Sequence, residues 1–356
     1  MKLKNVLLLM PLTVLAVPYS ALSQTVPADL MDLSIEDLFT ANVVSEEEQQ
    51  KDKKRWHVSY TYGKSRFEEY YTGSQSLSYE DVLWRPGEVR TKDNYPVVPT
   101  EISQEIHAFL IGYDLNQDIT LRIAVPFIKQ SSDHISIIPG YDAFNISSSG
   151  VGDVVVLADM PIARTMNSIW RIGAGLSLPT GSIDEQGDTP RAPGNQQLPY
   201  TMQIGSGTFD MPLLASYEKF ESGFRWGVDA GATLRLNEND RDYRLGHKFS
   251  LGSWIKFTSL GPIEPGIRLA YRWQGKISGE DTDLSVPVPA FPYPAPVVDP
   301  DDFGGQQVDL AVFARLPLGT NGWYVEANYS QPVYRDLNGP QSSEKFHTNI
   351  TIGTSF

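Results

Sequence analysis

The chain contains no cysteine, and its basic residues are outnumbered, 29 against 43 acidic ones. The absence of cysteine excludes a disulfide-stapled fold and a lipid-anchored amino terminus. The resulting net charge of −14 argues against nucleic acid as a partner. After the first 25 residues there is also no apolar run long enough for a transmembrane helix, which needs about 20 residues. If the processed chain enters a membrane, it must therefore do so with strands.

The first 23 residues have the three parts of a secretory signal peptide. Lys2 and Lys4 form a basic start, Val6 to Val17 is apolar, and Ala21-Leu22-Ser23 fits a small-x-small cleavage site. We expect cleavage before Gln24, which removes two lysines and takes the net charge from −14 to −16. An exported chain without disulfides needs another means of holding its fold, and a closed hydrogen-bonded barrel is one.

Residues 24–54 show no strand pattern. Ser34 to Asp37 resembles a capping box, which predicts a short helix, and Ser45 to Lys54 is densely charged. We interpret this segment as a helix and tether on the periplasmic side. A disordered extension fits the composition equally well.

From residue 55 onwards, apolar and polar side chains alternate with period two, as they do in strands with unlike faces. The segments that show this pattern are 56–66, 103–115, 117–127, 153–163, 168–178, 208–218, 223–236, 245–257, 263–274, 307–317, 322–330 and 346–356. Short connections of a few residues alternate with long ones along the chain. An even number of strands with this alternation predicts a transmembrane antiparallel β-barrel of about twelve strands, whose two chain ends lie on the periplasmic side.

Two features leave alternatives open. Residues 76–84 and 89–98 could form an extra hairpin above the membrane, or could raise the strand count to fourteen. The closing segment 346–356 ends on Phe356, which resembles the last strand of bacterial outer-membrane barrels, where a terminal Phe is recognised by the barrel-assembly machinery. A soluble β-sandwich could also end on such a strand.

Charged residues occupy the face of the strands opposite the apolar one. In a soluble sandwich they would face water, whereas in a barrel the apolar face contacts lipid and the charges face the lumen. They are Arg122, Asp153, Asp159, Arg171, Asp210, Glu218, Arg225, Asp229, Arg235, Lys248, Lys256, Glu264, Arg268, Arg272, Asp309, Arg315 and Glu326. The two signs nearly balance, so we expect a narrow lumen crossed by ion pairs. The residues predicted to line the path are Arg122, Arg171, Arg225, Asp229, Arg268, Arg272, Asp309 and Glu326.

Aromatic residues near strand ends fit girdles at the two membrane interfaces. They are Trp56, Trp170, Trp226, Trp273, Trp323 and Phe356. The stretch from Glu280 to Phe303 is rich in proline and aspartate, and we expect a plain solvated loop there rather than a cation site.

No catalytic, cofactor or metal motif occurs in the sequence. The five histidines, at positions 57, 107, 134, 247 and 347, are scattered, and neither a nucleophile elbow nor a phosphate loop is present. The chain is therefore predicted not to be an enzyme. A lipid-modifying barrel using His57 or His347 is the least favoured alternative.

Three short segments, taken in order, carry a family resemblance. They are Gly150 to Val156, Leu176 to Gly181 with Asp184-Glu185 after it, and Gly205 to Asp210. Together they resemble the outer-membrane transporter family named for the meta-pathway of phenol degradation. The resemblance implies a barrel that passes small, often hydrophobic or aromatic compounds. Read from the residues alone, the glycines permit turns or bulges, and Pro179-Thr180-Gly181 ends a strand at the outer rim.

The sequence thus predicts a channel or transporter in the outer membrane, with lipid, a small-molecule solute and the assembly machinery as partners. A structural or binding barrel that anchors another protein through residues 24–54 is the main alternative.

Overall fold

The computed structural model of the chain describes residues 55–319 and 321–356. The signal peptide and the periplasmic helix and tether, predicted for residues 1–54, lie outside the described residues. No helix in the described ranges is long and apolar enough to cross a membrane.

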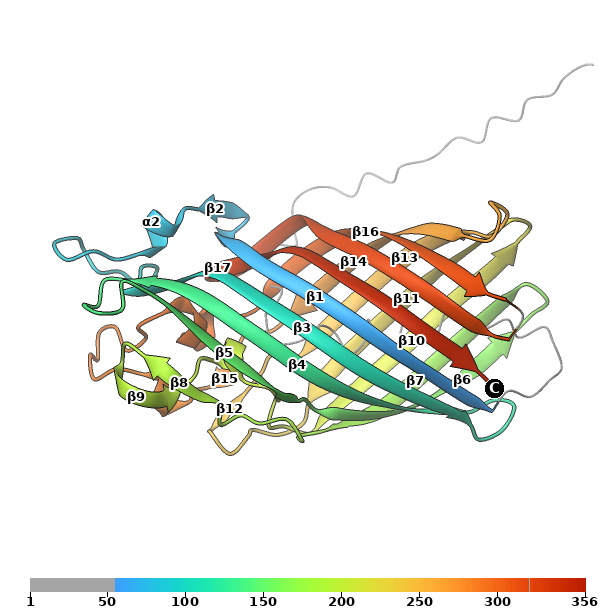
Figure 1. The fold of residues 1–356 in the computed structure, drawn as a ribbon, viewed down its shortest axis with the longest axis horizontal. Coiled ribbons are helices and arrows are strands. Elements are labelled where there is room, and N and C mark those ends of the chain that lie inside the picture. The colour runs from blue at the N-terminus through green and yellow to red at the C-terminus, as the bar shows by residue number, and fades with distance from the viewer. Residues whose placement is uncertain (1–54, 320) are drawn as a thin grey trace, which may run out of the picture.

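Eleven strand elements form a closed antiparallel ring, in which each pairs with the next and the last pairs with the first (Figure 1). They are β1 (Trp56–Gly73), β3 (Val97–Asp114), β4 (Thr120–Ser136), β6 (Val154–Arg164), β7 (Ser168–Leu178), β10 (Asp210–Glu221), β11 (Phe224–Arg235), β13 (Lys248–Phe257), β14 (Glu264–Gln274), β16 (Gly305–Leu318) and β17 (Trp323–Ser355). The predicted all-β barrel is confirmed.

The element β17 crosses the barrel wall twice. Its first arm, 323–337, pairs antiparallel with β16, and its second arm, 341–355, pairs antiparallel with β1. The chain reverses between the arms, where Gly339 has φ 57°. A ring in which all neighbours are antiparallel needs an even number of strands, and the two arms of β17 supply it. The wall therefore has twelve strand segments, the number predicted from the sequence.

The remaining elements lie at the end of the barrel that carries the long connections, here called the loop end; the opposite end is the turn end (Figure 1). They are β2 (Gln75–Leu77), α2 (Tyr79–Val82), β5 (Ala143–Val151), β8 (Gln186–Thr189), β9 (Ala192–Gln197), β12 (Tyr243–Arg244), β15 (Ser278–Gly279) and four short 3-10 helices, η1 (Tyr200–Met202), η2 (Thr282–Leu284), η3 (Pro296–Val298) and η4 (Pro300–Asp302). Because β2 is short and pairs with the end of β1, the region 76–98 adds no crossing, and the fourteen-strand alternative is wrong.

The distribution of apolar and charged side chains in the barrel is inverted relative to that of a soluble protein. On β4, the outward Ile123 and Val125 are 38% and 36% exposed, whereas the inward Arg122 and Ala124 are 5% and 1% exposed. Strand side chains alternate between faces, so this difference continues along each crossing. Among residues 55–319 and 321–356 no other layer covers the apolar face, which argues against the soluble sandwich and favours lipid as its environment.

The wall extends beyond this apolar band at the loop end. On the outer face of β1 and β3, aromatic residues give way to charged ones, and ion pairs join Lys64 to Glu105 (2.9 Å) and Arg66 to Glu101 (2.8 Å). These pairs mark the boundary of the bilayer, since charged side chains on the lipid face are costly at depth. At the turn end, Trp170 lies against Tyr217 with ring centroids 4.6 Å apart, as expected of an interfacial girdle.

Candidate functional site: the lumen and its cap

Ion pairs between neighbouring strands line the inner face on the β4–β11 side. Arg122 Nε donates to Asp159 Oδ1 over 2.6 Å, and Arg171 lies 3.8 Å from the other oxygen of the same carboxylate. Nearer the loop end, Arg235 and Asp210 form a pair of 2.5 Å whose side chains are 2% and 1% exposed. Buried charges of this kind require compensation, and each of these has an opposite charge beside it.

The β11–β17 side carries a second set of pairs. Arg268 makes a two-bond contact with Asp229 (2.6 and 2.5 Å), and Lys256 lies 2.9 Å from Glu264. Arg272 bridges two carboxylates, Asp309 at 2.6 Å and Glu344 at 2.5 Å. The positive and negative side chains alternate closely, so the lumen is not an electrostatic funnel for ions of one sign.

The eight residues predicted to line the path all lie on barrel strands and point inward. Arg122 is on β4, Arg171 on β7, Arg225 and Asp229 on β11, Arg268 and Arg272 on β14, Asp309 on β16 and Glu326 on β17. Glu326 lies opposite Arg315 in the β16–β17 register, and Arg225 lies 3.9 Å from Glu218. The structure thus distributes the eight residues around the lumen rather than gathering them at one point.

Half of these residues border one cavity of about 100 Å³ against the β13–β17 wall. Its lining residues are Trp254, Lys256, Arg268, Ala270, Arg272, Asp309, Ala311, Phe313, Glu326, Asn328, Ser330, His347 and Asn349. The space admits several water molecules or one small solute. The aromatic and amide side chains in this lining were not singled out from the sequence, because alternation identifies an inward face without showing where the space remains.

The opposite side of the lumen is filled. Ile204, from the β7–β10 connection, packs with Ile128, Val155 and Leu157 in a cluster whose members are at most 7% exposed. Apolar packing thus occupies much of this half of the barrel, where a cavity of about 30 Å³ beside Leu110 and Arg122 is smaller than the one on the β13–β17 side.

The three motifs of the family resemblance hold that filling segment in place. Asp153 accepts hydrogen bonds from the backbone of Gly181 (2.9 Å) and Ser206 (2.8 Å), so the segments meet at one carboxylate. A Cβ atom on Gly205 would come within 2.4 Å of the Gly181 carbonyl oxygen. Close backbone approach therefore explains Gly181 and Gly205, beside the break where β5 gives way to β6 as the partner of β4.

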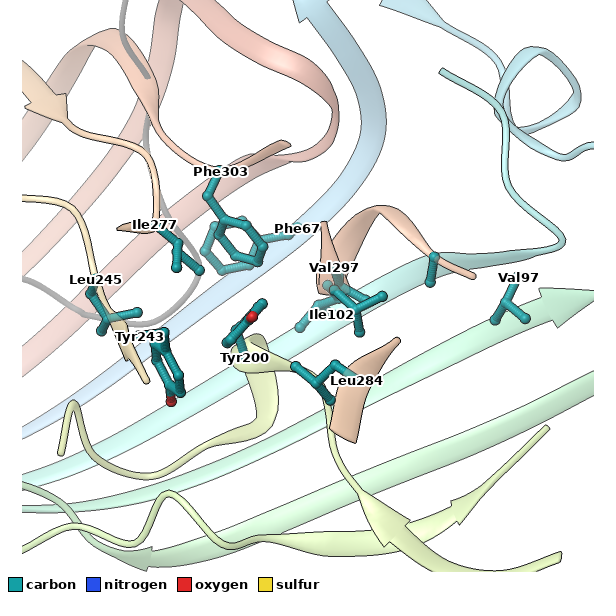
Figure 2. Close-up of a cluster of buried hydrophobic side chains, with 12 residues drawn as sticks. Phe67, Val97, Ile102, Tyr200, Tyr243, Leu245, Ile277, Leu284, Val297 and Phe303 are labelled. Carbon is teal, nitrogen blue, oxygen red and sulfur yellow. The ribbon is translucent and has the colours of Figure 1, made fainter. Parts of the chain in front are cut away.

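The loop end of the lumen is closed by a cap, made of residues 179–209, 236–247 and 275–304. The cap and the wall share one apolar cluster: Phe67, Val97, Ile102, Tyr200, Tyr243, Leu245, Ile277, Leu284, Ala295, Val297, Val298 and Phe303. Figure 2 shows Tyr200 between Tyr243, Phe303 and the inward Phe67 and Ile102. The expectation of a plain solvated loop at 280–303 is wrong, because alternating prolines hold apolar side chains of this stretch against the cluster.

Polar contacts tie the three cap segments together. Arg241 lies 2.7 Å from Asp184, 3.1 Å from Asp281 and 3.2 Å from Asp283, so one guanidinium joins all three. The Tyr200 hydroxyl accepts a hydrogen bond from the Asp281 backbone over 2.9 Å. The cap is consequently a packed and cross-linked unit rather than a set of separate loops.

A series of side-chain hydrogen bonds at the turn end joins a serine, a histidine and an aspartate, the residue types of a serine hydrolase triad. His57 Nδ1 lies 2.9 Å from Ser355 Oγ, and His57 Nε2 lies 3.0 Å from Asp114 Oδ2. Hydrolases use the opposite order, with the carboxylate on Nδ1 and the serine on Nε2. Thr120 extends the chain to Asp114 over 2.7 Å. The chain links β17, β1, β3 and β4 across the closing seam, which is a structural role.

Within the ranges that the structure describes, no group of three or more histidine and carboxylate side chains is arranged to hold a metal ion.

Comparison with known proteins gives a likeness of fold. The chain matches no family model and no curated protein sequence. Among solved structures, it is similar to the COG4313 outer membrane channel from Pseudomonas putida F1, with a TM-score of 0.55 and 14% identity over 88% of this chain and all of that one. Weaker matches include the Ralstonia pickettii toluene transporter TbuX, with a TM-score of 0.40 and 10% identity over 86% of this chain and 90% of that one. A Pseudomonas aeruginosa FadL homologue matches with a TM-score of 0.40 and 11% identity over 85% of this chain and 91% of that one.

Fold and lumen together define the class: a transmembrane antiparallel β-barrel of the outer-membrane type. Within that class, the chain has the fold of the Pseudomonas putida channel.

Proposed function

We propose that this protein is an outer-membrane channel for small molecules. The observation that carries the proposal is the cavity of about 100 Å³ along the β13–β17 wall, bordered by inward side chains of the lumen. Arg268, Arg272, Asp309 and Glu326 line the path there. Arg122, Arg171, Arg225 and Asp229 form paired positions around the rest of the lumen.

The lining of the cavity favours a small solute with a flat apolar part and polar substituents. Trp254 and Phe313 supply aromatic surface, while Asn328, Ser330 and Asn349 supply hydrogen-bonding groups. The charged residues are already matched by opposite charges, so selection by size and shape is favoured over selection by net charge. This agrees with the hydrophobic or aromatic compounds that the resemblance to the meta-pathway family implies.

The route to the membrane completes the proposal. Export uses the signal peptide 1–23, and the closing strand with Phe356 is recognised by the barrel-assembly machinery. Residues 24–54 then face the periplasm. The alternative role, anchoring a partner through that segment, is tested by a pull-down with the segment as bait; specific capture of a periplasmic protein would favour it.

Planar-bilayer recordings of the processed chain test the channel directly. We expect a small unit conductance, which rises when Arg272 or Trp254 is replaced by alanine because the cavity widens. Lys219→Ala is the matched control, since Lys219 pairs with Glu221 at the turn end of β10, on the outer face of the wall. A membrane that stays sealed to ions and to small solutes, even with the cap segment 276–303 deleted, would contradict the proposal.

A further inference from the structure

One hydroxyl group of the β2–β3 connection faces two carboxylates of the cap. Tyr95 Oη donates to Asp302 Oδ2 over 2.6 Å and also lies 3.1 Å from Asp299 Oδ2. Tyr95 is 1% exposed and Asp302 is 7% exposed, so water does not substitute freely for these contacts. The other oxygen of Asp299 accepts a hydrogen bond from the Asp301 backbone.

A single hydroxyl proton cannot serve both carboxylates. Tyr95 has one donor, and two ionised carboxylates converging on it would leave like charges close together in a site shielded from water. An additional proton on one carboxyl group relieves this conflict. The pKa of Asp302 is held well above its ordinary value, mainly by burial and then by the negative charge of Asp299. Burial also raises the pKa of Asp299.

The neighbouring charges do not neutralise the pair. Asp93 and Asp301 add further negative charge around Asp302. Lys276 is bound to Asp301 over 2.9 Å, and the Arg90 guanidinium lies over the Tyr95 ring, 5.0 Å from its centroid. The Tyr70 side chain approaches from β1, and the turn of β17 contributes the uncharged Gly339.

The cluster lies where three parts of the molecule meet. Tyr95 belongs to the β2–β3 connection, Asp302 to η4, and Gly339 to the turn of β17, where an added Cβ would meet Asp302. We call residues 276–303 the strap. Six prolines stiffen the strap, and glycines flank it at 275 and 304, the latter with φ 87°. A stiff segment between glycines is arranged to move as a unit, and its other end is held through Asp281 and Asp283, which contact Arg241.

We propose that Tyr95, Asp299 and Asp302 form a proton-dependent latch that regulates the cap of the channel. The inference rests on the proposed channel function, because the latch controls access to that lumen. With the proton bound, the strap is held to the β2–β3 connection; once the proton is lost, repulsion between the two carboxylates loosens it.

The direction of the pH dependence of cap opening follows from the raised pKa of Asp302. Its stabilisation of the closed cap is complete at pH values below the ordinary carboxyl range and is lost as the pH rises through the raised value. For one proton, the ratio of open to closed cap changes by up to about tenfold per pH unit within that window. Strap residues supply half of the apolar cluster around Tyr200, so loss of the proton weakens one of several attachments of the strap. The wall stays folded while the strap opens more often.

Two measurements on the processed chain test the latch between about pH 5 and about pH 9. The first is open probability in planar bilayers. The second is the mobility of a spin label at Val288→Cys on the strap, which is specific because the chain has no other cysteine. We expect both to rise with pH in the parent protein, and to stay at their acid values in Asp302→Asn. The control Asp240→Asn changes an exposed carboxylate of the cap outside the cluster of Tyr95, Asp299 and Asp302, and should follow the parent.

The outcomes separate the latch from the channel. Strap mobility that is independent of pH, or that responds equally in Asp302→Asn, would overturn the latch while leaving the channel intact. Mobility that rises with pH in a protein that never conducts would support the latch and overturn the channel. If Asp302→Asn does not assemble, shown by loss of heat-modifiable migration on a gel, Asp299→Asn carries the same test because it removes the other carboxylate.

Discussion

The bridge made by Arg272 offers the sharpest test of how the lumen is held together. Its guanidinium joins Asp309 (2.6 Å) and Glu344 (2.5 Å), whose side chains are each 4% exposed. Gln307 is the other donor to both carboxylates, at 2.7 and 2.8 Å. Arg272→Met would therefore leave two buried negative charges held by neutral donors, Gln307 to both and Ser65 to Glu344 (3.3 Å).

The cost of that change can be bounded from the exposure of the groups. Removing one partner of a buried pair costs about 3–5 kcal/mol, and because the Arg272 side chain is 23% exposed we expect a loss at or just below the bottom of that range, about 2–3 kcal/mol. Adding Glu344→Gln should recover about half of this loss by removing one unpaired charge.

Urea unfolding of the barrel in lipid vesicles, followed by tryptophan fluorescence, measures the free energy of unfolding. Lys276→Met, which breaks a surface pair with Asp301, is the matched control and should cause no measurable loss. If Arg272→Met is no more destabilising than Lys276→Met, or if Glu344→Gln adds to the loss, then buried charge pairing is not what holds this wall.

Three further predictions concern the β7–β10 connection that fills part of the lumen, the lipid face, and the closing seam between β17 and β1. Gly205→Val should dislodge the β7–β10 connection, since its Cβ would meet the Gly181 carbonyl at 2.4 Å, and should increase single-channel conductance; unchanged conductance would contradict it. Ile352→Arg places a charge on the lipid face and should cost about 2–4 kcal/mol in vesicle unfolding, against a small change for Ile352→Leu. Ser355 should not react with a fluorophosphonate probe, given the nitrogen order of His57, and covalent labelling lost in Ser355→Ala would refute this.

The crossings could be predicted from the sequence because each strand contacts two different solvents. Lipid outside and charge pairs inside impose period two on every crossing, and β7 (Ser168–Leu178) matches its predicted bounds. The segments above the bilayer lack this contrast. The strand β5, Ala143–Val151, carries serines and glycine and was interpreted as part of a long loop. Glu344 was missed for the same reason, since 331–344 reads as a polar connection.

The cap could not be predicted because its packing depends on partners far away in the chain. Tyr200 meets Tyr243 and Phe303, which are separated from it by whole strands, and no local pattern encodes that meeting. The motif glycines gave a partial signal: they indicated turns, but the convergence of their segments on Asp153 required the fold.

Because β17 supplies two neighbouring strand segments of the wall, closure of the ring is coupled to docking of the strap. The turn between the arms receives the end of the strap, where Asn338 donates to the Phe303 carbonyl and Gln341 to the Gly304 carbonyl. This docking site does not exist until the carboxyl-terminal hairpin has formed and its second arm has paired with β1. During biogenesis, resistance of the strap to protease should thus arise together with ring closure, and a barrel caught before that step would have an unfinished entrance.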